Sequence, residues 1–285
     1  MNPYIQILLA TVIWGATGAF VKLIDLPISA LASVRLLAPT AALLLYFIYK
    51  KKLAFLSTTP RSLVWVSVIN IIRVVMYFIG FKNTSVGSAI ILLYTWPIFV
   101  TIAASIFLKE KSTRPMKALI ALAFLGTYVI QMHTRFSFQD HDFVGMMAML
   151  ISSLCSAATV VIFKATGDTH SHTEKVFFQN AAGGLLVLPF LYWLIPNPQP
   201  IPLAIAAGFA IFTGVLGYSL FFSALNKIPS SHASFLSYFE VITTLIFSSF
   251  LLHEHVTWNM TLGGSMILFS VIFLHHFRTV PEEDI

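Results

Sequence analysis

The sequence predicts an all-α membrane protein with ten transmembrane helices, arranged as two inverted repeats of five helices. Three observations support this fold class. Of the 285 residues, 58% are apolar and 10% are charged, and the mean hydropathy is +0.86, which is typical of integral membrane proteins. The apolar residues fall into long runs, and the second half of the chain repeats the first. The distribution of Lys and Arg alternates between loops, as expected for a chain that crosses a membrane repeatedly.

Each predicted span is long enough to cross about 30 Å of hydrocarbon as an α-helix. A β-barrel is excluded, because its strands would be short and would alternate apolar with polar residues. The first run has no basic segment before it and no small-residue cleavage site, so we expect it to stay as a helix. The spans are 3–24, 28–49, 62–81, 86–108, 115–132, 143–163, 174–194, 202–225, 231–252 and 259–277.

An internal repeat relates the segment from Thr84 to Met116 to the residues 144 positions later. Ten of the 33 positions carry the same residue type in the copy, which is more than a shared apolar bias should give. Tyr94 matches Tyr238, for example. We therefore predict a first five-helix repeat at 1–139 and a second at 140–285.

The basic residues predict the orientation of the chain. With the N-terminus in the cytoplasm, twelve of the 17 Lys and Arg residues fall on the cytoplasmic side and three on the outer side, while Arg35 and Arg73 lie within helices. This bias follows the positive-inside rule and explains the net positive charge without nucleic acid. Five helices per repeat is an odd number, so the second repeat is inverted, an arrangement typical of secondary transporters.

Several motifs resemble the EamA branch of the drug/metabolite transporter superfamily. Val241 departs from the family pattern, which commonly has proline there, and the Trp-Gly of the first helix returns only as Cys155-Ser156 or Ser156-Ala157. The resemblance covers essentially the whole chain. It implies both termini in the cytoplasm, a central cavity lined by helices one, three, four, six, eight and nine, and alternating access. The matching residues are Ile13-Trp14-Gly15-Ala16, Lys22, Arg35, Trp96-Pro97, Glu110, Phe239-Glu240-Val241 and Glu254.

Polar residues inside the spans indicate where a site lies. A charge at the bilayer centre costs roughly 2.5–3.5 kcal/mol on insertion scales, so Arg73 must face protein, water or ligand. Three helices each place polar residues on one face at helical spacing, and we expect these faces to line one aqueous cavity. The faces are Asn70, Arg73 and Tyr77 on helix three, Ser152, Ser156 and Thr159 on helix six, and Ser237, Glu240 and Thr244 on helix nine.

Two interpretations of Arg73 and Glu240 remain open. They pair with each other and hold helices three and nine together, or they form the charged part of a substrate site. In the second case Arg73 binds a carboxylate or phosphate, and Glu240 binds an amine or a coupling proton. Candidate aromatic walls of the site, by stacking or cation–π contact, are Tyr77, Tyr94, Trp96, Tyr218 and Tyr238.

Other residues are assigned to the scaffold or to gating. Pro97 cannot donate a backbone hydrogen bond, which predicts a local opening of helix four and a hinge. Arg35 is expected to act in structure or gating. Glu110 and Glu254, at helix ends, are expected to cap a helix start or to hold loops together.

The sequence predicts no enzyme, cofactor or metal site. Its histidine pairs, at 170 and 172 and at 275 and 276, lack a thiolate or carboxylate set, and no phosphate-binding motif is present. The predicted function is secondary transport of a small metabolite in a bacterial inner membrane. Amino acids or their derivatives come first, because a cation and an anion at the midplane suit a zwitterion.

Alternatives remain for the substrate and the assembly. Quaternary or aromatic amines are the second substrate class, and a membrane-embedded enzyme or a non-transporting scaffold is a remote alternative. The expected partners are a small-molecule substrate, the lipid bilayer and a candidate coupling proton at Glu240. The sequence leaves open a monomer or a homodimer, the direction of transport and the coupling ion.

Overall fold

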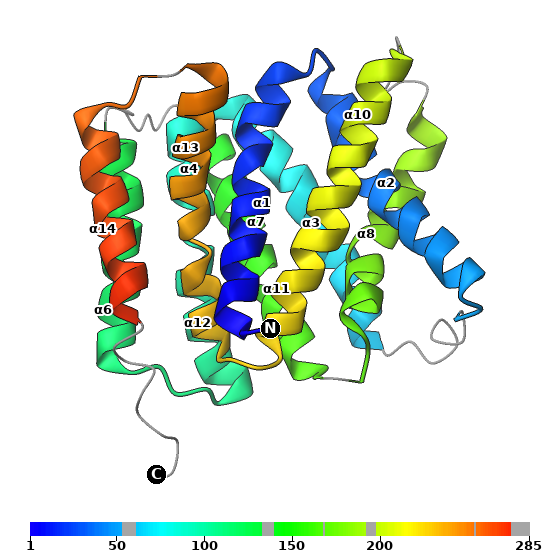
Figure 1. Ribbon diagram of the computed structural model, residues 1–285. Coiled ribbons are helices and arrows are strands. Elements are labelled where there is room, and N and C mark those ends of the chain that lie inside the picture. The colour runs from blue at the N-terminus through cyan, green and yellow to red at the C-terminus, as the bar shows by residue number, and fades with distance from the viewer. Residues whose placement is uncertain (53–60, 133–139, 168, 192–197, 254, 275–285) are drawn as a thin grey trace.

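A computed structural model describes residues 1–52, 61–132, 140–167, 169–191, 198–253 and 255–274. These residues form helices joined by short connections, and no strand is found among them (Figure 1). Successive segments run in opposite directions through one bundle. The elements are α1 (Pro3–Leu23), α2 (Ile28–Tyr49), α3 (Arg61–Asn83), α4 (Val86–Leu93), α5 (Trp96–Ala103), η2 (Ala104–Leu108), α6 (Arg114–Ile130), α7 (Asp140–Ala165), α8 (His172–Val187), η3 (Leu188–Phe190), α10 (Pro200–Ile211), η4 (Phe212–Gly217), α11 (Tyr218–Leu225), α12 (Ser230–Leu236), α13 (Phe239–Leu252) and α14 (Trp258–Leu274).

Every predicted span contains helix in the structure. Six segments are long and apolar enough to cross a membrane by length and composition, while Pro3–Thr17 and Trp258–Leu274 are shorter apolar helices. The described chain is therefore all-helical with multiple membrane-spanning candidates. The six are Ser29–Tyr49, Arg61–Asn83, Ser88–Leu108, Asp142–Ala165, Pro200–Leu225 and Ser230–Leu252.

Helix boundaries recur at the 144-residue spacing of the sequence repeat. Helix α6 and helix α14 begin and end 144 residues apart, and α2 and α8 begin 144 residues apart. Thr113 and Thr257 each accept a hydrogen bond from a backbone N–H at the start of the following helix, which is ordinary N-capping. Lys109 and His253 both end a helix in the left-handed conformation, with φ of 57° and 54°.

The packing of helices follows the same pairing. Helix α1 contacts α11 and α13, while its counterpart by position, α7, contacts α3 and α5. Helix α2 contacts α10, and α8 contacts α3. Two helices also pack directly against their own counterparts: α6 contacts α14, and α2 contacts α8. Each of these contacts joins the two halves, and the contacts of a helix in the first half recur, with the halves exchanged, for its counterpart in the second.

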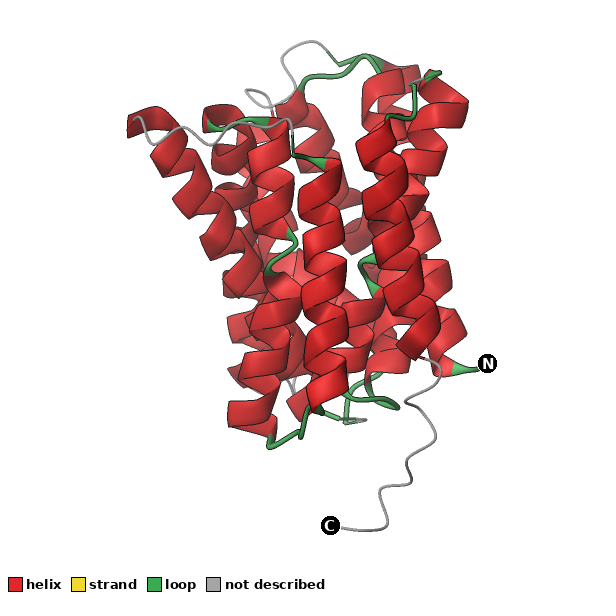
Figure 2. Ribbon diagram, turned by 90° about the vertical axis from the view of Figure 1, so that its left-hand side faces the viewer, coloured by secondary structure: helices red, strands yellow, loops and turns green. Residues whose placement is uncertain are grey.

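Two helical segments are interrupted near their middle. Tyr94 and Thr95 form a turn between α4 and α5, and Ser237 and Tyr238 form one between α12 and α13. Figure 2 shows short non-helical stretches at mid-height in the bundle. Pro97 occupies the second position of α5, so helix four is interrupted directly before this proline, while the hinge at Pro97 stays a prediction.

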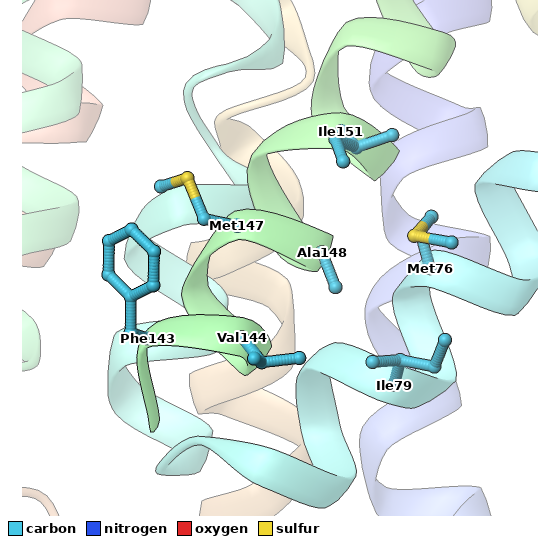
Figure 3. A pocket seen from close by; sticks show the side chains of 7 residues that line it. All are labelled: Met76, Ile79, Phe143, Val144, Met147, Ala148 and Ile151. Atoms are coloured by element: carbon cyan, nitrogen blue, oxygen red, sulfur yellow. The ribbon is translucent and has the colours of Figure 1, made fainter. Parts of the chain in front are cut away.

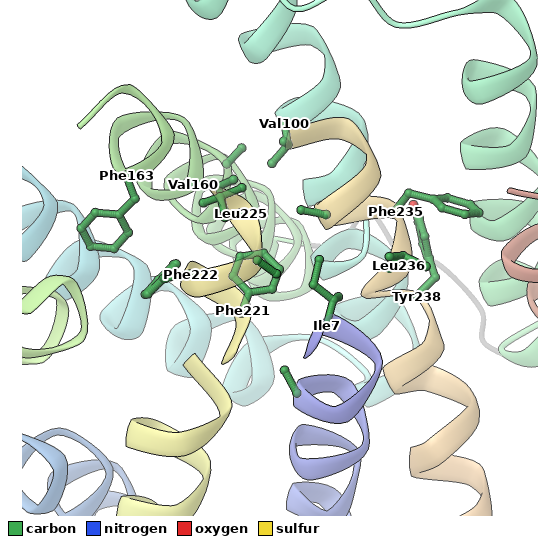
Figure 4. Close-up of a cluster of buried hydrophobic side chains, with 14 of the residues drawn as sticks. Ile7, Val100, Val160, Phe163, Phe221, Phe222, Leu225, Phe235, Leu236 and Tyr238 are labelled. Atoms are coloured by element: carbon green, nitrogen blue, oxygen red, sulfur yellow. The ribbon is translucent and has the colours of Figure 1, made fainter. Parts of the chain in front are cut away.

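The apolar core is concentrated at one end of the bundle. We call the end at which α1 begins and α14 ends the N-terminal face, and the other end the opposite face (Figure 1). Of the twelve largest fully buried side chains in the described chain, nine lie in the turns nearest the N-terminal face. These nine are Ile7, Phe47, Leu63, Phe163, Lys175, Phe222, Leu225, Phe235 and Leu236. Figure 4 shows several of them converging from α1, α7, α11 and α12.

Candidate functional site

Three charged side chains meet in the middle of the bundle. Arg35 comes from α2, Arg73 from α3 and Glu240 from the start of α13, directly after the break at Tyr238. The charges of Arg35 and Arg73 both act on Tyr218 and on Tyr77, as does the charge of Glu240. Groups that interact in this way occupy one small region, although they lie far apart in the sequence. The structure therefore brings Arg73, Tyr77, Tyr218 and Glu240 together.

The side chains of the charged cluster are not fully buried. Arg35, Arg73, Tyr77, Tyr218 and Glu240 are each half-buried. The surrounding protein desolvates Arg35, Tyr77, Tyr218 and Glu240. These side chains therefore keep part of their surface accessible within the bundle.

Arg73 is held by neutral groups. Its Nε donates to Asn70 Oδ1 at 2.9 Å, and Asn70 Nδ2 donates to the backbone oxygen of Gln179 on α8 at 2.5 Å. The backbone oxygen of Arg73 accepts a hydrogen bond from Ser152 Oγ at 3.0 Å. Asn70 therefore positions the guanidinium, and helices α7 and α8 fix its place along α3.

Glu240 interacts with a different arginine from the one considered in the sequence analysis. Its carboxyl is affected by the charge of Arg35 and by a side-chain hydrogen bond with Tyr94. Arg35 also has a side-chain hydrogen bond with Tyr218. The sequence analysis assigned Arg35 to structure or gating, paired with a carbonyl or an acid, but did not identify Glu240 as that acid, because nothing in the sequence shows that α2 and α13 meet at the cluster.

Aromatic rings cover one side of the cluster. The Trp14 ring lies 4.8 Å from the Tyr218 ring and 5.5 Å from the Phe221 ring, and Trp96 lies 6.4 Å from Phe221. Trp14 Nε1 donates to the backbone oxygen of Thr213 at 3.2 Å. Trp14 was not a predicted site residue, although the Trp-Gly motif of the first helix was a signal that could have identified it.

Glycine makes the close approach of Trp14 feasible. A Cβ at Gly217 would lie 2.5 Å from Trp14 Nε1, and one at Gly15 would lie 2.0 Å from Thr243 Oγ1. Any larger residue at these positions would push α1 away from α11 or α13. The two glycines thus set the position of the Trp14 ring.

The predicted site residues divide into two groups by burial. Arg73, Tyr77, Trp96, Tyr218 and Glu240 are half-buried, whereas the others are buried and have little or no surface for a ligand in this structure. The Tyr238 hydroxyl donates to the backbone oxygen of Tyr94 at 2.8 Å, and Ser237 Oγ donates to its own helix. The buried residues are Asn70, Tyr94, Ser237 and Tyr238, and they hold the cluster from behind.

Irregular helix geometry coincides with the cluster. The breaks at Tyr94 and Tyr238 precede Trp96 and Glu240, and the π-helical segment η4 ends directly before Tyr218. Interrupted helices are typical of transport sites, because they free backbone groups near the midplane, and π-bulges are frequent at functional sites. Three of the segments that carry the cluster therefore have irregular helix geometry next to a cluster residue.

Polar contacts tie the helix ends together at the N-terminal face. Glu110 accepts hydrogen bonds from the backbone N–H of Ser230 at 2.7 Å and from its hydroxyl at 3.1 Å, so it caps α12. A capping or loop-holding role for Glu110 is confirmed, but the helix it caps is not the one that follows it, because Thr113 caps α6. Glu254 lies outside the described residues.

Two lysines close the same face. Lys164 Nζ donates to the backbone oxygens of Leu225 and Ile228, at 2.7 and 2.8 Å. Lys175 is 1% exposed, and its Nζ donates to three acceptors on neighbouring segments. The acceptors are the backbone oxygens of Phe163 and Gly167 and the side-chain oxygen of Asn226.

An apolar groove lies away from the charged cluster, between α3 and α7 (Figure 3). Its volume is about 290 Å³, and no charged side chain lines it. Four of its residues are exposed on the outside of the bundle, where a membrane protein meets lipid. The groove therefore suits hydrocarbon rather than a polar ligand. It is lined by Met76, Ile79, Phe143, Val144, Met147, Ala148 and Ile151.

Within the described residues, no cluster of three or more metal-ligating side chains is found. His170 contacts Thr169, and the pair at 275 and 276 lies outside the described residues. The half-buried Cys155 is a free thiol.

Comparison with known proteins gives matches to transporters over most of the chain. The model of the EamA-like transporter family matches residues 1–132 and 143–275. The uncharacterized transporter YoaV of Bacillus subtilis is 26% identical over 284 residues, covering 95% of each chain. The pseudopaline exporter CntI of Pseudomonas aeruginosa is 24% identical over 185 residues, covering 65% of this chain and 64% of the exporter. A crystal structure with 15% identity has the same fold, with a TM-score of 0.75 over 94% of this chain and 96% of that one.

Proposed function

The chain belongs to the EamA-like transporter family, and on that premise we propose that it is a secondary transporter of small polar metabolites that binds its substrate at the charged cluster. One observation carries this proposal: Arg35, Arg73 and Glu240 are half-buried in the middle of a multi-pass bundle, beside interrupted helices. Charges at this depth are costly unless function requires them. The cluster is thus the substrate site.

The architecture proposed is ten transmembrane helices in two inverted repeats, 1–139 and 140–285. The shared helix bounds and the paired contacts support a duplication, as does the separate match of the family model to each half. Five passages separate the start of α1 from the start of α7, so these two helices run in opposite directions. Inverted repeats of this kind accompany alternating access in transporters.

We place the N-terminal face in the cytoplasm of a bacterial inner membrane. This face carries the ends of α2, η2, α7 and α11, where most of the lysines and arginines lie. Segments rich in Lys and Arg remain on the cytoplasmic side. The start of α1 and the end of α14 share this face (Figure 1), which supports cytoplasmic termini.

The conformation is closed toward the N-terminal face. Fully buried aromatic and aliphatic side chains fill that end, and Glu110, Lys164 and Lys175 bridge its helix ends. At the opposite face the equivalent positions in α1, α3 and α13 are mostly half-buried. Substrate therefore reaches the cluster from the opposite face in this state, and a second state would open the N-terminal face.

Amino acids and their derivatives are the first substrate class, because the cluster offers both guanidinium groups and a carboxylate. The name of the pseudopaline exporter is compatible with export of a metabolite. Quaternary or aromatic amines are a second class, favoured by the Trp14, Trp96 and Tyr218 rings near Glu240. Glu240 is also the candidate site for a coupling proton.

Uptake into protein-only vesicles tests this function. Labelled amino acids, choline and aromatic amines are offered with and without a pH gradient to the parent and to Glu240→Gln, with Asp25→Asn on an exposed loop as the control. We expect the parent to concentrate an amino acid under the gradient and Glu240→Gln to exchange it without concentrating it. A folded Glu240→Gln protein that matches the parent on every substrate would contradict the role of Glu240.

A further inference from the structure

The charges of the cluster do not balance. Among the described residues, the charged groups that act on both Tyr77 and Tyr218 are the two guanidiniums of Arg35 and Arg73 and the one carboxylate of Glu240. The tyrosines of the cluster are neutral near pH 7, and arginine stays protonated in proteins. The site therefore carries one more positive charge than negative charge when Glu240 is ionised, and two when it is protonated.

The unbalanced charge is best assigned to Arg73. Glu240 acts on Arg35, so these two groups offset each other. The polar contacts of Arg73 are instead with neutral groups: Asn70 accepts from Nε, and the Ser152 hydroxyl donates to its backbone oxygen. The bond to Asn70 uses one of the five N–H donors of the guanidinium.

A half-buried cation without a counter-charge favours an anionic partner. Buried charges are stable when they are paired and hydrogen-bonded. Guanidinium binds carboxylate and phosphate through two parallel hydrogen bonds, which adds both strength and orientation. Asn70, fixed by the Gln179 carbonyl, holds the Arg73 fork in one orientation before any ligand arrives.

We infer that the substrate carries a net negative charge, with one more anionic group than cationic group, and that Arg73 binds the additional anion. This inference rests on the proposed function and narrows its substrate class. An acidic amino acid, or an amino acid bearing a further carboxylate or a phosphate, satisfies it. A neutral zwitterion would leave the site with its excess positive charge.

Matched pairs of substrates test the inference without any mutation. Counterflow in protein vesicles does not depend on the natural direction of transport, and it compares labelled L-glutamate with L-glutamine and L-aspartate with L-asparagine. O-phospho-L-serine against L-serine distinguishes phosphate from carboxylate as the additional anion. Each pair differs in net charge, and the amide pairs are nearly equal in size. We expect the parent to prefer the anionic member by at least about tenfold.

The variant Arg73→Gln assigns the preference to its residue. It should lower the anionic-to-neutral ratio toward one, because the lost attraction acts on the additional anion alone. Arg73→Lys should keep part of the preference. The matched control is Arg61→Gln, an exposed arginine at the start of the same helix, and it should keep the parent ratio. A general loss of packing lowers both rates of a pair and leaves their ratio unchanged.

The outcomes separate the inference from the proposed function. Equal or faster exchange of the neutral members by the parent would overturn the inference and leave amino-acid transport standing. Exchange of none of these compounds above that of empty vesicles would overturn amino-acid transport itself. A parent preference that persists in a folded Arg73→Gln protein would overturn the assignment to Arg73.

Discussion

The two ends of the bundle are built from the same 144-residue pattern, yet different contents fill the space between their helices. At the N-terminal face, large side chains are fully buried, and lysines and Glu110 bind helix ends. Toward the opposite face and at the middle, charged and aromatic side chains are half-buried. This difference shows that the helix scaffold and the site are separable. The scaffold is repeated in the two halves, whereas the charged and aromatic residues of the site are not.

Positions related by 144 residues show where the repeat stops. Arg73 corresponds to Gly217, and Arg35 corresponds to Gln179. In one half the arginine reaches the cluster, while in the other half glycine leaves room for Trp14. A site for an asymmetric ligand requires such differences, whereas a packed closure does not.

The largest effect on stability is expected from Phe222→Ala at the packed end. Phe222 is 2% exposed and touches Phe163, Tyr218 and Phe221. Removing a fully buried ring costs about 3–5 kcal/mol through lost contacts and the cavity that remains. The half-buried Phe247 on α13 is the matched control, and Phe247→Ala should cost much less. Thermal unfolding in detergent measures both, and equal losses would contradict the contrast between the two ends.

A smaller effect is expected from Lys175→Met. The substitution removes a donor from Asn226 Oδ1 and from two backbone oxygens. The oxygens of Phe163 and Gly167 keep donors from Thr166 and Asn226, so we expect a cost close to that of one buried acceptor, about 1–3 kcal/mol. The exposed Lys227 nearby provides the control, and Lys227→Met should change the free energy of unfolding by less than about 0.5 kcal/mol. Should Lys175→Met unfold at the parent temperature, the lysine would not be holding the N-terminal face together.

Gly217→Ala probes the boundary between the two regions. The new Cβ would meet Trp14 Nε1 at 2.5 Å, and such overpacking costs about 1–3 kcal/mol. Transport should fall as well, since the Trp14 ring must move. Gly208→Ala has open space around its Cβ and should be neutral or slightly stabilising, because alanine favours helix. Thermal unfolding and vesicle transport are measured for both variants. Equal stability and equal transport rates of Gly217→Ala and Gly208→Ala would contradict the proposed position of the Trp14 ring.

The smallest effect is expected from Glu110→Gln. Glutamine keeps an acceptor for the backbone N–H of Ser230 but removes the negative charge at the start of α12, a change worth about 1 kcal/mol. We expect a modest change in the transport rate, because the N-terminal face opens more easily. Asp25→Asn, on an exposed loop, is the control. Unchanged unfolding and transport would show that the cap does not contribute to closure.

The sequence was a good guide to the helices, because long apolar runs and capping residues are local signals. All ten predicted spans contain helix. The break at Tyr94 and Thr95 lies directly before Pro97, but the matching break at Ser237 and Tyr238 forms with Val241 in place of the proline. Part of the cluster could be predicted from the sequence, because charged residues such as Arg73 and Glu240 cost free energy at any position within a membrane span. Their role in binding stays a prediction.

Contacts between distant helices were not accessible in the same way. The interaction of the Arg35 and Glu240 charges depends on how α2 and α13 approach, and nothing local to Arg35 encodes it. The burial of Tyr94 and Tyr238 was equally hidden, since an aromatic ring at the midplane fits both a wall and a core. Capping of α12 by Glu110 likewise joins segments 120 residues apart.

Access of water-soluble reagents to the two ends tests the central claim most directly. In a Cys155→Ser background, Thr244→Cys places a thiol one turn from Glu240, and Ala233→Cys places one in the packed end. A charged thiol reagent is applied separately to each side of the membrane without substrate. We predict labelling of Thr244→Cys from the opposite face only, and none of Ala233→Cys from either side. Labelling of Thr244→Cys from the N-terminal face alone, or equal labelling of both thiols, would contradict a site that is closed at the N-terminal face and open at the other.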